Sequence, residues 1–364
     1  MSFCDLAVSG VADLQPYVPG KPIEELQRQY GVHDVIKLAS NENPLGPSKA
    51  ALAAVAKSSK EMTRYPDGNG YTLKMALAEK LRLSPQQITL GNGSNDVLEL
   101  LARTFAGHGD EVIYSEHAFA VYPLAVKAIG ATGIATPAKD YGHDLKAMLK
   151  AISPRTKLIF IANPNNPTGT WIESAEVQAF LDKVPEKVLV VLDEAYVEYL
   201  EQTESSVNWL QSFDNLIITR TFSKAYGLAG LRVGYALSHP EIADLLNRIR
   251  QPFNVNSLAQ AAAVAALGDE SYLQQSREVN QTGMLQLTGE FDKMGLKYIP
   301  SKGNFITVNV HTNAAEVYDE LLYEGVIVRP IAGYGLPQHL RVSIGLEQEN
   351  QRFLEALSRV LGRG

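Results

Sequence analysis

The chain has 364 residues, a formal net charge of -7 and 45% hydrophobic residues, which is the composition of a folded globular protein. Because 40 acidic residues outnumber 33 basic ones, the surface is poorly suited to neutralising a phosphate backbone, and nucleic acid is not an expected partner. Cys4 is the only cysteine, and no signal peptide or membrane-length apolar run is found, so we expect a cytoplasmic protein that does not enter a membrane.

The first part of the chain predicts an arm followed by an alternating α/β region. Residues 1–33 contain several turn formers and little hydrophobic period, so we expect an extended arm. Beyond it, helical patterns at 72–82 and 95–106 lead to a strand-like segment at 111–114. Alternation of this kind is typical of a parallel sheet.

Three short apolar runs, rich in β-branched residues, predict strands that are buried on both faces of that sheet. They are KLIFIA at 157–162, VLVVLD at 188–193 and LIITRT at 216–221. A helical pattern at 173–183 separates the first two and is long enough for a right-handed crossover. The predicted fold class is α/β, with a mostly parallel central sheet flanked by helices.

The pattern changes after about residue 252. Two helical patterns precede short strand patterns and a final helix: helices at 257–267 and 271–294, then strands at 303–310, 326–328 and 339–344. This order predicts a small α+β domain over 253–364, beside a large domain over 34–252.

A polar segment follows each of the three buried runs. The segments are NPNNPTG at 163–169, DEAY at 193–196 and TFSKAYG at 221–227. Each alone has an ordinary explanation as a turn, a cap or an exposed lysine. In parallel sheets, however, the carboxyl ends of the strands meet at one edge, where ligands bind. A carboxylate, Asp193, and an amine, Lys224, at successive strand ends are what pyridoxal phosphate requires.

These three segments, in this order and over almost the whole chain, resemble the fold type I pyridoxal-phosphate-dependent aminotransferases. The resemblance implies that Lys224 forms the Schiff base with pyridoxal 5′-phosphate and later moves the proton, and that Asp193 pairs with the protonated ring nitrogen. It also implies that Tyr196 and Asn166 hydrogen-bond the ring oxygen. Phe119 falls where the family places an aromatic ring against the cofactor; many relatives have tyrosine there, so only the stacking role carries over.

The segment GNGSND at 91–96 predicts a binding site for the cofactor phosphate. Small residues, with Ser94 and Asn95 at the end, open directly into a helix, so backbone amides and the helix dipole can bind an anion. The dinucleotide fingerprint and the P-loop ending are both lacking, which disfavours a nucleotide. By resemblance, Ser223 and Arg232 complete the phosphate site.

Tyr65, in RYPDGNG, is on turn chemistry alone a partly exposed loop residue. The resemblance implies instead that this tyrosine reaches the cofactor phosphate of a neighbouring subunit. We therefore expect a homodimer with shared active sites.

Two further segments, IKLASNENPLGPS and VIVRPIAGYGLPQHLRVSIG, resemble the histidinol-phosphate aminotransferases. By resemblance Arg341 binds a carboxylate, Arg329 is a second cation, and Tyr17 and Asn166 are further substrate contacts. Two arginine forks suit a phosphate monoester, whereas a single carboxylate needs one. The implied reaction, a step of histidine biosynthesis, exchanges an amino group between L-histidinol phosphate and 2-oxoglutarate, giving imidazole-acetol phosphate and glutamate. No metal site is predicted.

Other functions remain open at this point. An aromatic amino-acid aminotransferase would use the same cavity, with Arg341 on the carboxylate, and a phospho-amino-acid decarboxylase shares the fold. A cofactor-sensing regulator would need a nucleic-acid-binding segment, which the sequence does not contain. An NAD-dependent oxidoreductase is disfavoured because the glycine fingerprint is missing.

Overall fold

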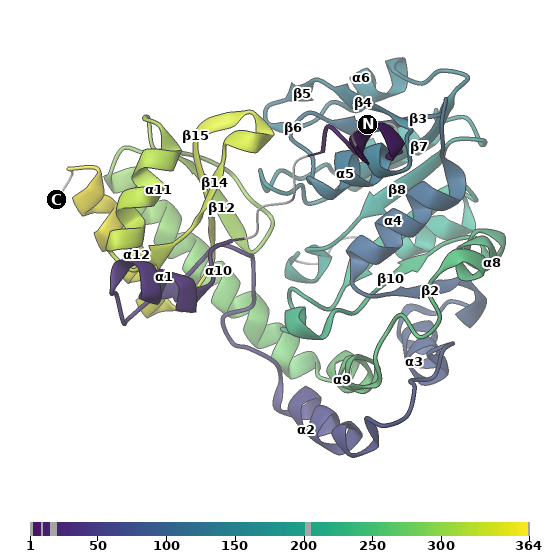
Figure 1. The fold of residues 1–364 in the computed structure, drawn as a ribbon, viewed down its shortest axis with the longest axis horizontal. Coiled ribbons are helices and arrows are strands. Elements are labelled where there is room, and N and C mark those ends of the chain that lie inside the picture. Colours follow the sequence, from purple (N-terminus) through teal and green to yellow (C-terminus); the bar gives the residue numbers. More distant parts are fainter. Residues whose placement is uncertain (1–2, 9, 15–19, 201–204, 363–364) are drawn as a thin grey trace.

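The computed structural model describes residues 3–8, 10–14, 20–200 and 205–362. Two separate sheets organise the chain, the large one with its helices on the right of Figure 1 and the small one on the left. The large sheet has the order β2-β10-β9-β8-β7-β3-β4. Its strands are β2 (Ile88–Gly91), β3 (Glu111–Ser115), β4 (Thr132–Thr136), β7 (Thr156–Ala162), β8 (Leu189–Asp193), β9 (Leu216–Thr221) and β10 (Gly234–Leu237).

The strands from β9 to β4 pair in parallel, and only β10 runs antiparallel to its neighbours β9 and β2. The mostly parallel α/β sheet predicted from the sequence is therefore confirmed, as are its three central strands. Asp193 at the end of β8 lies opposite Ala162 on β7 and Thr219 on β9. This register brings the polar segments after the three strands to the same edge of the sheet.

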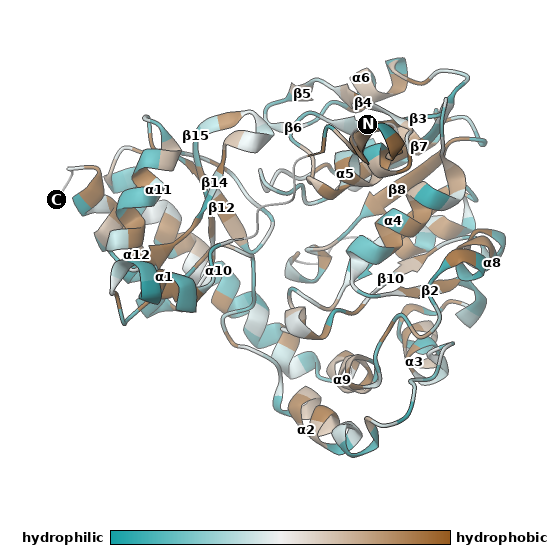
Figure 2. Cartoon of the chain, viewed as in Figure 1, coloured by the Kyte–Doolittle hydropathy of each residue, from teal (hydrophilic) through white to brown (hydrophobic). Residues whose placement is uncertain are grey.

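Helices cover both faces of the large sheet, and each face has its own hydrophobic core. One core is formed with α3 (Tyr71–Leu81), α7 (Ser174–Leu181) and α9 (Ser257–Leu267), and the other with α4 (Ser94–Phe105), α5 (Val121–Ala128) and α8 (Pro240–Ile249). Figure 2 shows the result: the central strands are largely brown, and the outer helices carry teal on their exposed sides. The remaining elements of this part are α2 (Lys49–Ser58), α6 (Leu145–Lys150) and the hairpin of β5 (Ala138–Lys139) and β6 (Gly142–His143).

The small sheet is antiparallel throughout, with the order β11-β12-β15-β14. Its strands are β11 (Lys297–Ile299), β12 (Phe305–Asn309), β14 (Arg329–Ile331) and β15 (Leu336–Ser343), and its helices are α10 (Glu270–Lys293), α11 (Ala314–Tyr323) and α12 (Glu347–Val360). A short parallel pair, β1 (Ile36–Lys37) with β13 (Val326–Ile327), ties the start of the chain to this unit. Across the described ranges, no helix combines the length and the apolar character needed to cross a membrane.

The prediction of an extended arm over residues 1–33 is wrong in part, because α1 (Ile23–Tyr30) and a short 3-10 helix (Phe3–Leu6) lie within it. Acidic residues occupy the first turn of α1, and Gly31 ends it in a left-handed conformation. Leu26 of this helix is fully buried against Leu322 and Ile327. Burial of this apolar side chain therefore stabilises a helix in a segment for which the turn-forming residues predicted an extended chain.

The domain limits at residues 33 and 252 stay predictions. Val255 and the alanine-rich face of α9 belong to the hydrophobic core of the large sheet, and α9 packs against α2 and α3. We therefore propose that the boundary between the domains lies after α9.

Candidate active site

A cavity of about 180 Å³ lies where the polar strand ends of the large sheet face the small sheet. It collects side chains predicted for cofactor and substrate from segments that are far apart in the sequence. The predicted residues that line it are Ser94, Asn95, Phe119, Asn166, Asp193, Tyr196, Ser223, Lys224, Arg232, Arg329 and Arg341. Of the predicted residues that the structure describes, Tyr65 is not among these lining residues.

Lys224 follows β9, and its Nζ donates a hydrogen bond of 3.0 Å to the backbone oxygen of Ser40. Burial lowers the pKa of this amine to about 7, and the nearby charge of Arg341 acts in the same direction. A large fraction of Lys224 is therefore neutral near pH 7. A neutral amine is a nucleophile and a base, whereas a protonated lysine is neither.

Asp193 presents a buried carboxylate at the end of β8. The hydroxyl of Tyr122 donates to Oδ2 at 2.8 Å, and the hydroxyl of Thr219 donates to Oδ1 at 2.9 Å. Burial raises the pKa of Asp193 to about 6 although both hydrogen bonds act to lower it. A buried carboxylate of this kind gains most from a cationic partner in the cavity.

The start of α4 has the features of an anion site. A Cβ on Gly93 would lie 2.4 Å from Nη2 of Arg232, so only glycine lets this guanidinium lie against the helix start. Nη1 of Arg232 donates to Oγ of Ser223 at 3.2 Å. The helix N-terminus, a hydroxyl and a guanidinium thus point to one place, which is the donor set that a phosphate requires.

Tyr196 lies beside the same cavity, with its hydroxyl accepting a hydrogen bond of 2.9 Å from Nδ2 of Asn41. Burial raises the pKa of Tyr196 to about 12, so the hydroxyl stays protonated at neutral pH. It can therefore donate its own hydrogen to an oxygen atom of a ligand. Phe119 also lines the cavity, and its ring meets that of Tyr122 edge to face at 5.9 Å.

Arg329 and Arg341 lie directly opposite each other on β14 and β15. Both side chains also line the cavity, so two positive charges lie side by side in its wall. Arg341 is buried, and Nη2 donates to the backbone oxygen of Ala39 at 2.6 Å while Nη1 donates to Oδ1 of Asn166 at 2.6 Å. The wall of the cavity formed by the small sheet is therefore cationic.

One predicted residue, Tyr65, stands apart from this cavity. Tyr65 is 83% exposed, and its ring stacks on that of Phe253 with centroids 4.7 Å apart. Tyr17 lies outside the described residues. Roles for both in this site remain predictions.

Sequence reasoning missed further residues of the site, among them Asn41 and Tyr334, which line the cavity, and Tyr122 and Thr219, which donate to Asp193. Thr219 could have been found from strand alternation, since residues 219 and 221 of β9 share a face. Tyr122 follows Phe119 by three residues, in the first turn of α5. Asn41 and Tyr334 lie in the two segments that resemble the histidinol-phosphate aminotransferases, but no local pattern marks either residue as part of the site. Nδ1 of His117 lies 2.7 Å from the backbone oxygen of Tyr334, which fixes this last segment against the large sheet.

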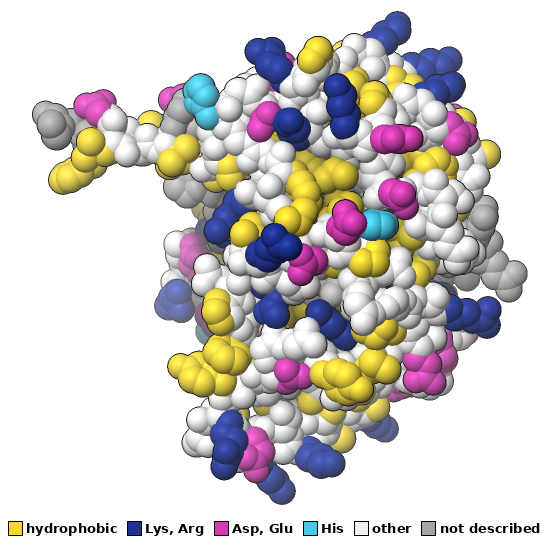
Figure 3. Space-filling model, turned by 90° about the vertical axis from the view of Figure 1, so that its right-hand side faces the viewer, with side chains coloured by type: hydrophobic (Ala, Val, Ile, Leu, Met, Phe, Trp, Pro, Cys, Tyr) yellow, Lys and Arg dark blue, Asp and Glu magenta, His cyan; other side chains and the backbone are white. Residues whose placement is uncertain are grey.

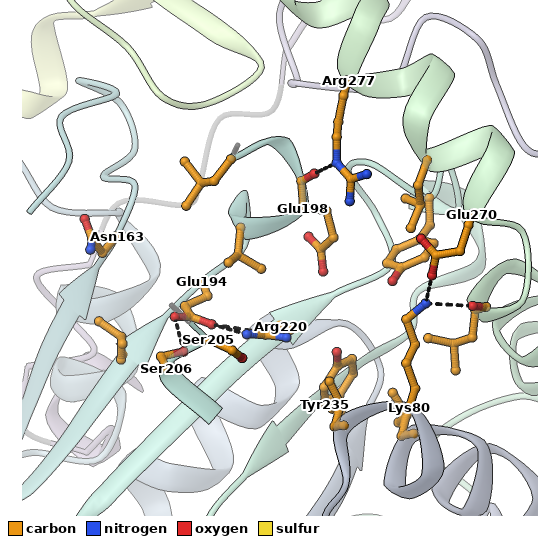
Figure 4. Close-up of a pocket in the computed structure, with 18 of the residues that line it drawn as sticks. Lys80, Asn163, Glu194, Glu198, Ser205, Ser206, Arg220, Tyr235, Glu270 and Arg277 are labelled. Carbon is orange, nitrogen blue, oxygen red and sulfur yellow. Dashed lines mark hydrogen bonds and ion pairs between the residues drawn. The ribbon is translucent and has the colours of Figure 1, made fainter. Parts of the chain in front are cut away.

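A second, larger cavity of about 820 Å³ contains none of the predicted catalytic side chains. Figure 4 shows Glu194 and Arg220 pointing toward each other there, with Ser206 beside them. The ion pair is buried, with Nη2 of Arg220 2.7 Å from Oε2 of Glu194. Consecutive residues of an extended chain point to opposite sides, so Asp193 faces the first cavity and Glu194 the second. The charges of Glu194 and Arg220 are thus paired within the protein, whereas Oε2 of Glu198, which also lines this cavity, is buried without a hydrogen-bond partner among the described residues.

Comparison with known proteins gives matches over the whole chain. The family model "Aminotransferase class I and II" matches residues 33–357. Histidinol-phosphate aminotransferase 2 of Pseudomonas fluorescens (strain Pf0-1) is 59% identical over 100% of this chain and 99% of its own length. Histidinol-phosphate aminotransferase 1 of Nitrosococcus oceani is 58% identical over 99% and 98%. The crystal structure of histidinol-phosphate aminotransferase from Sinorhizobium meliloti in complex with pyridoxal-5′-phosphate superposes with a TM-score of 0.88 at 31% identity, covering 96% of this chain and 97% of that one.

Proposed function

This chain belongs to the aminotransferase class I and II family, and we propose that it transfers an amino group from L-histidinol phosphate to 2-oxoglutarate. The products are imidazole-acetol phosphate and L-glutamate, and the reaction is a step of histidine biosynthesis. Relatives that are 59% and 58% identical over nearly their full lengths carry the name of this activity. The observation in this chain that carries the proposal is the pair of facing arginines, Arg329 and Arg341, on one wall of the cavity.

The cofactor is pyridoxal 5′-phosphate, and the residues at the first cavity fit it. The anion site that the phosphate requires would be formed by Ser223, Arg232 and the start of α4. Gly93 leaves the space that the guanidinium of Arg232 occupies there. The buried carboxylate of Asp193 suits a protonated ring nitrogen, and Tyr196 supplies a hydroxyl donor for the ring oxygen. When bound, this cofactor accepts the amino group and stabilises negative charge at the substrate carbon that loses a proton.

The chain's own residues then have separate tasks. Lys224 anchors the cofactor and, once released, its Nζ accepts the proton from the substrate carbon that carries the amino group. Its lowered pKa supports this role, because the amine must be neutral to accept a proton. Asn166 holds Arg341 in place through a hydrogen bond of 2.6 Å and so links the cofactor side of the cavity to the substrate side.

Substrate recognition follows from the cationic wall. The phosphate monoester of histidinol phosphate can accept hydrogen bonds from two guanidinium forks, and its charge offsets the repulsion between them. In the second half-reaction, 2-oxoglutarate offers two carboxylates to the same pair. One site can thus serve both substrates in turn.

Arg341 paired with Asn166 also supports a second candidate, aromatic amino-acid transamination, because this pair suits a substrate α-carboxylate. A decarboxylase of the same fold is the third. Product analysis separates all three: the proposal expects glutamate formation dependent on histidinol phosphate. Release of carbon dioxide from a phospho-amino acid, or turnover only with aromatic amino acids, would contradict it.

We further propose a homodimer with shared active sites. The exposed pair of Tyr65 and Phe253 is unusual for aromatic rings in a monomer, and Leu52 and Met62 are exposed as well. Figure 3 shows hydrophobic side chains gathered into patches on one face of the molecule. In the proposed dimer, Tyr65 reaches the cofactor phosphate of the other subunit. The cytoplasmic location stays a prediction from the sequence.

A further inference from the structure

Tyr122 connects three features of the site although it does not line the cavity. It lies in the first turn of α5, is fully buried, and stacks on Phe160 with ring centroids 4.7 Å apart and planes at 5°. The edge of its ring meets Phe119, and its hydroxyl donates to Oδ2 of Asp193 at 2.8 Å. The ring is thus fixed on two sides, and the hydroxyl can point only at the carboxylate.

We propose that Tyr122 is a positioning residue that holds the carboxylate of Asp193 ionised and aimed at the cofactor ring nitrogen, while its ring supports Phe119. The inference rests on the role proposed for Asp193. It adds a residue on a different element, α5, to the residues that control the cofactor ring.

The chemistry of the hydroxyl supports this role. Burial raises the pKa of Tyr122 well above its usual value, so the hydroxyl remains a donor at every pH at which the protein works. A hydrogen bond donated to a carboxylate favours its ionised form, and this one opposes the effect of burial on Asp193. Thr219 on β9 also donates to Asp193, and the hydroxyl of Tyr196 lies close enough to interact with it electrostatically. The charge of Glu194, on the opposite side of the strand, acts to raise the pKa of Asp193.

The test is equilibrium binding of two ligands to Lys224→Ala protein, in which the cofactor is held without a covalent bond. One ligand is pyridoxal 5′-phosphate, and the other is its analogue with carbon in place of the ring nitrogen. Adding Tyr122→Phe should weaken binding of pyridoxal 5′-phosphate about tenfold, the effect of losing a hydrogen bond to a charged group. Binding of the carbon analogue should change less than about twofold, because it has no ring charge for Asp193 to meet.

Two further variants make the result specific. Tyr235→Phe removes the hydroxyl of another buried tyrosine, beside Arg220 on the other face of the sheet, and should change neither affinity. Thr219→Val removes the donor to the other oxygen of Asp193 and should act in the same direction as Tyr122→Phe. If Tyr122→Phe does not fold, which far-ultraviolet circular dichroism will reveal, Thr219→Val replaces it in the binding test.

The pH dependence provides a second readout. Affinity for pyridoxal 5′-phosphate should fall as Asp193 becomes protonated, near its pKa of about 6 in the cofactor-free protein. Loss of the Tyr122 donor disfavours the ionised form, so the midpoint should move to higher pH. An equal loss for both ligands, or an unmoved midpoint, would make Tyr122 merely a packing residue. If the protein without Tyr122→Phe binds neither ligand, the proposed function fails together with this inference.

Discussion

Arg341 donates a hydrogen bond of 2.6 Å from Nη1 to Oδ1 of Asn166, and this contact joins the small sheet to the segment that follows β7. The same guanidinium donates to the backbone oxygen of Ala39 and lies 5.5 Å from the ring centre of Phe305. Its position is therefore fixed from several sides before any substrate binds. Fixed cations of this kind bind anions without a large loss of side-chain entropy.

Arg341→Ala should impair both half-reactions, because the same guanidinium receives the donor substrate and 2-oxoglutarate. We expect roughly a 10- to 100-fold loss in kcat/KM for each, the effect of one charge-assisted hydrogen-bonded clamp. Single-turnover absorbance changes measure each half-reaction separately. Arg341→Lys is the matched control: it keeps the charge but loses the planar fork, so it should recover activity only in part. A normal rate with 2-oxoglutarate in the alanine variant would contradict this role.

Arg329→Ala should discriminate between amino donors. If Arg329 contacts the phosphate, kcat/KM for histidinol phosphate should fall roughly 10- to 100-fold, which corresponds to about 1.5 to 3 kcal/mol. Phenylalanine has no phosphate and should be affected much less. An equal loss for both donors would make Arg329 a structural residue and would favour the aromatic aminotransferase.

Asp193→Asn should keep some cofactor but lose most of the activity. An amide cannot hold the ring nitrogen protonated in a buried site, and we expect a loss in kcat of roughly 100-fold or more. Cofactor content by absorbance, measured on the same samples as kcat, separates binding from catalysis. A near-normal kcat at full cofactor occupancy would rule out the proposed pairing.

Lys224→Ala should abolish turnover. It should also abolish the covalent linkage between protein and cofactor that borohydride reduces to a stable bond. In the unmodified protein, capture of pyridoxal 5′-phosphate by borohydride should depend on pH, because only the neutral amine reacts. Burial lowers the pKa of Lys224 to about 7, so the rate should fall as pH decreases through about 7, whereas an ordinary lysine would lose reactivity near 10.5. A reducible adduct in the Lys224→Ala protein would place the anchor elsewhere.

Tyr65→Phe should weaken cofactor retention by about 1 kcal/mol or somewhat more, through a contact made across a subunit interface. Mixing inactive variants of Tyr65 and Lys224 tests whether sites are shared. If the two faults lie in different sites, a hybrid dimer has one site with both faults and one with neither, so activity should partly return. Absence of recovery, with subunit exchange verified, would assign Tyr65 to the site of its own subunit.

The strands and the residues that follow them could be predicted because their signals are local. β7, β8 and β9 are unbroken apolar runs, and each ends in a polar segment that must meet the others once the strands are parallel. Strand β10 was not predicted, and its antiparallel direction has no local signature, because direction is decided by how the chain returns to the sheet.

Contacts between distant segments could not be predicted from local patterns. Asn41 meets Tyr196 across a separation of 155 residues, and the order of β14 and β15 places Arg329 opposite Arg341. Helix α1 was missed for a related reason: Leu26 is buried by residues near 322 and 327, so its stability depends on tertiary packing.

The most direct test of the proposed function is kcat/KM for L-histidinol phosphate and for L-phenylalanine, measured side by side with 2-oxoglutarate as acceptor. If the facing arginines bind a phosphate monoester, histidinol phosphate should be preferred roughly 100-fold or more, since its phosphate engages two charge-assisted clamps. Equal values, or a preference for phenylalanine, would contradict the proposal and assign the chain to aromatic amino-acid transamination.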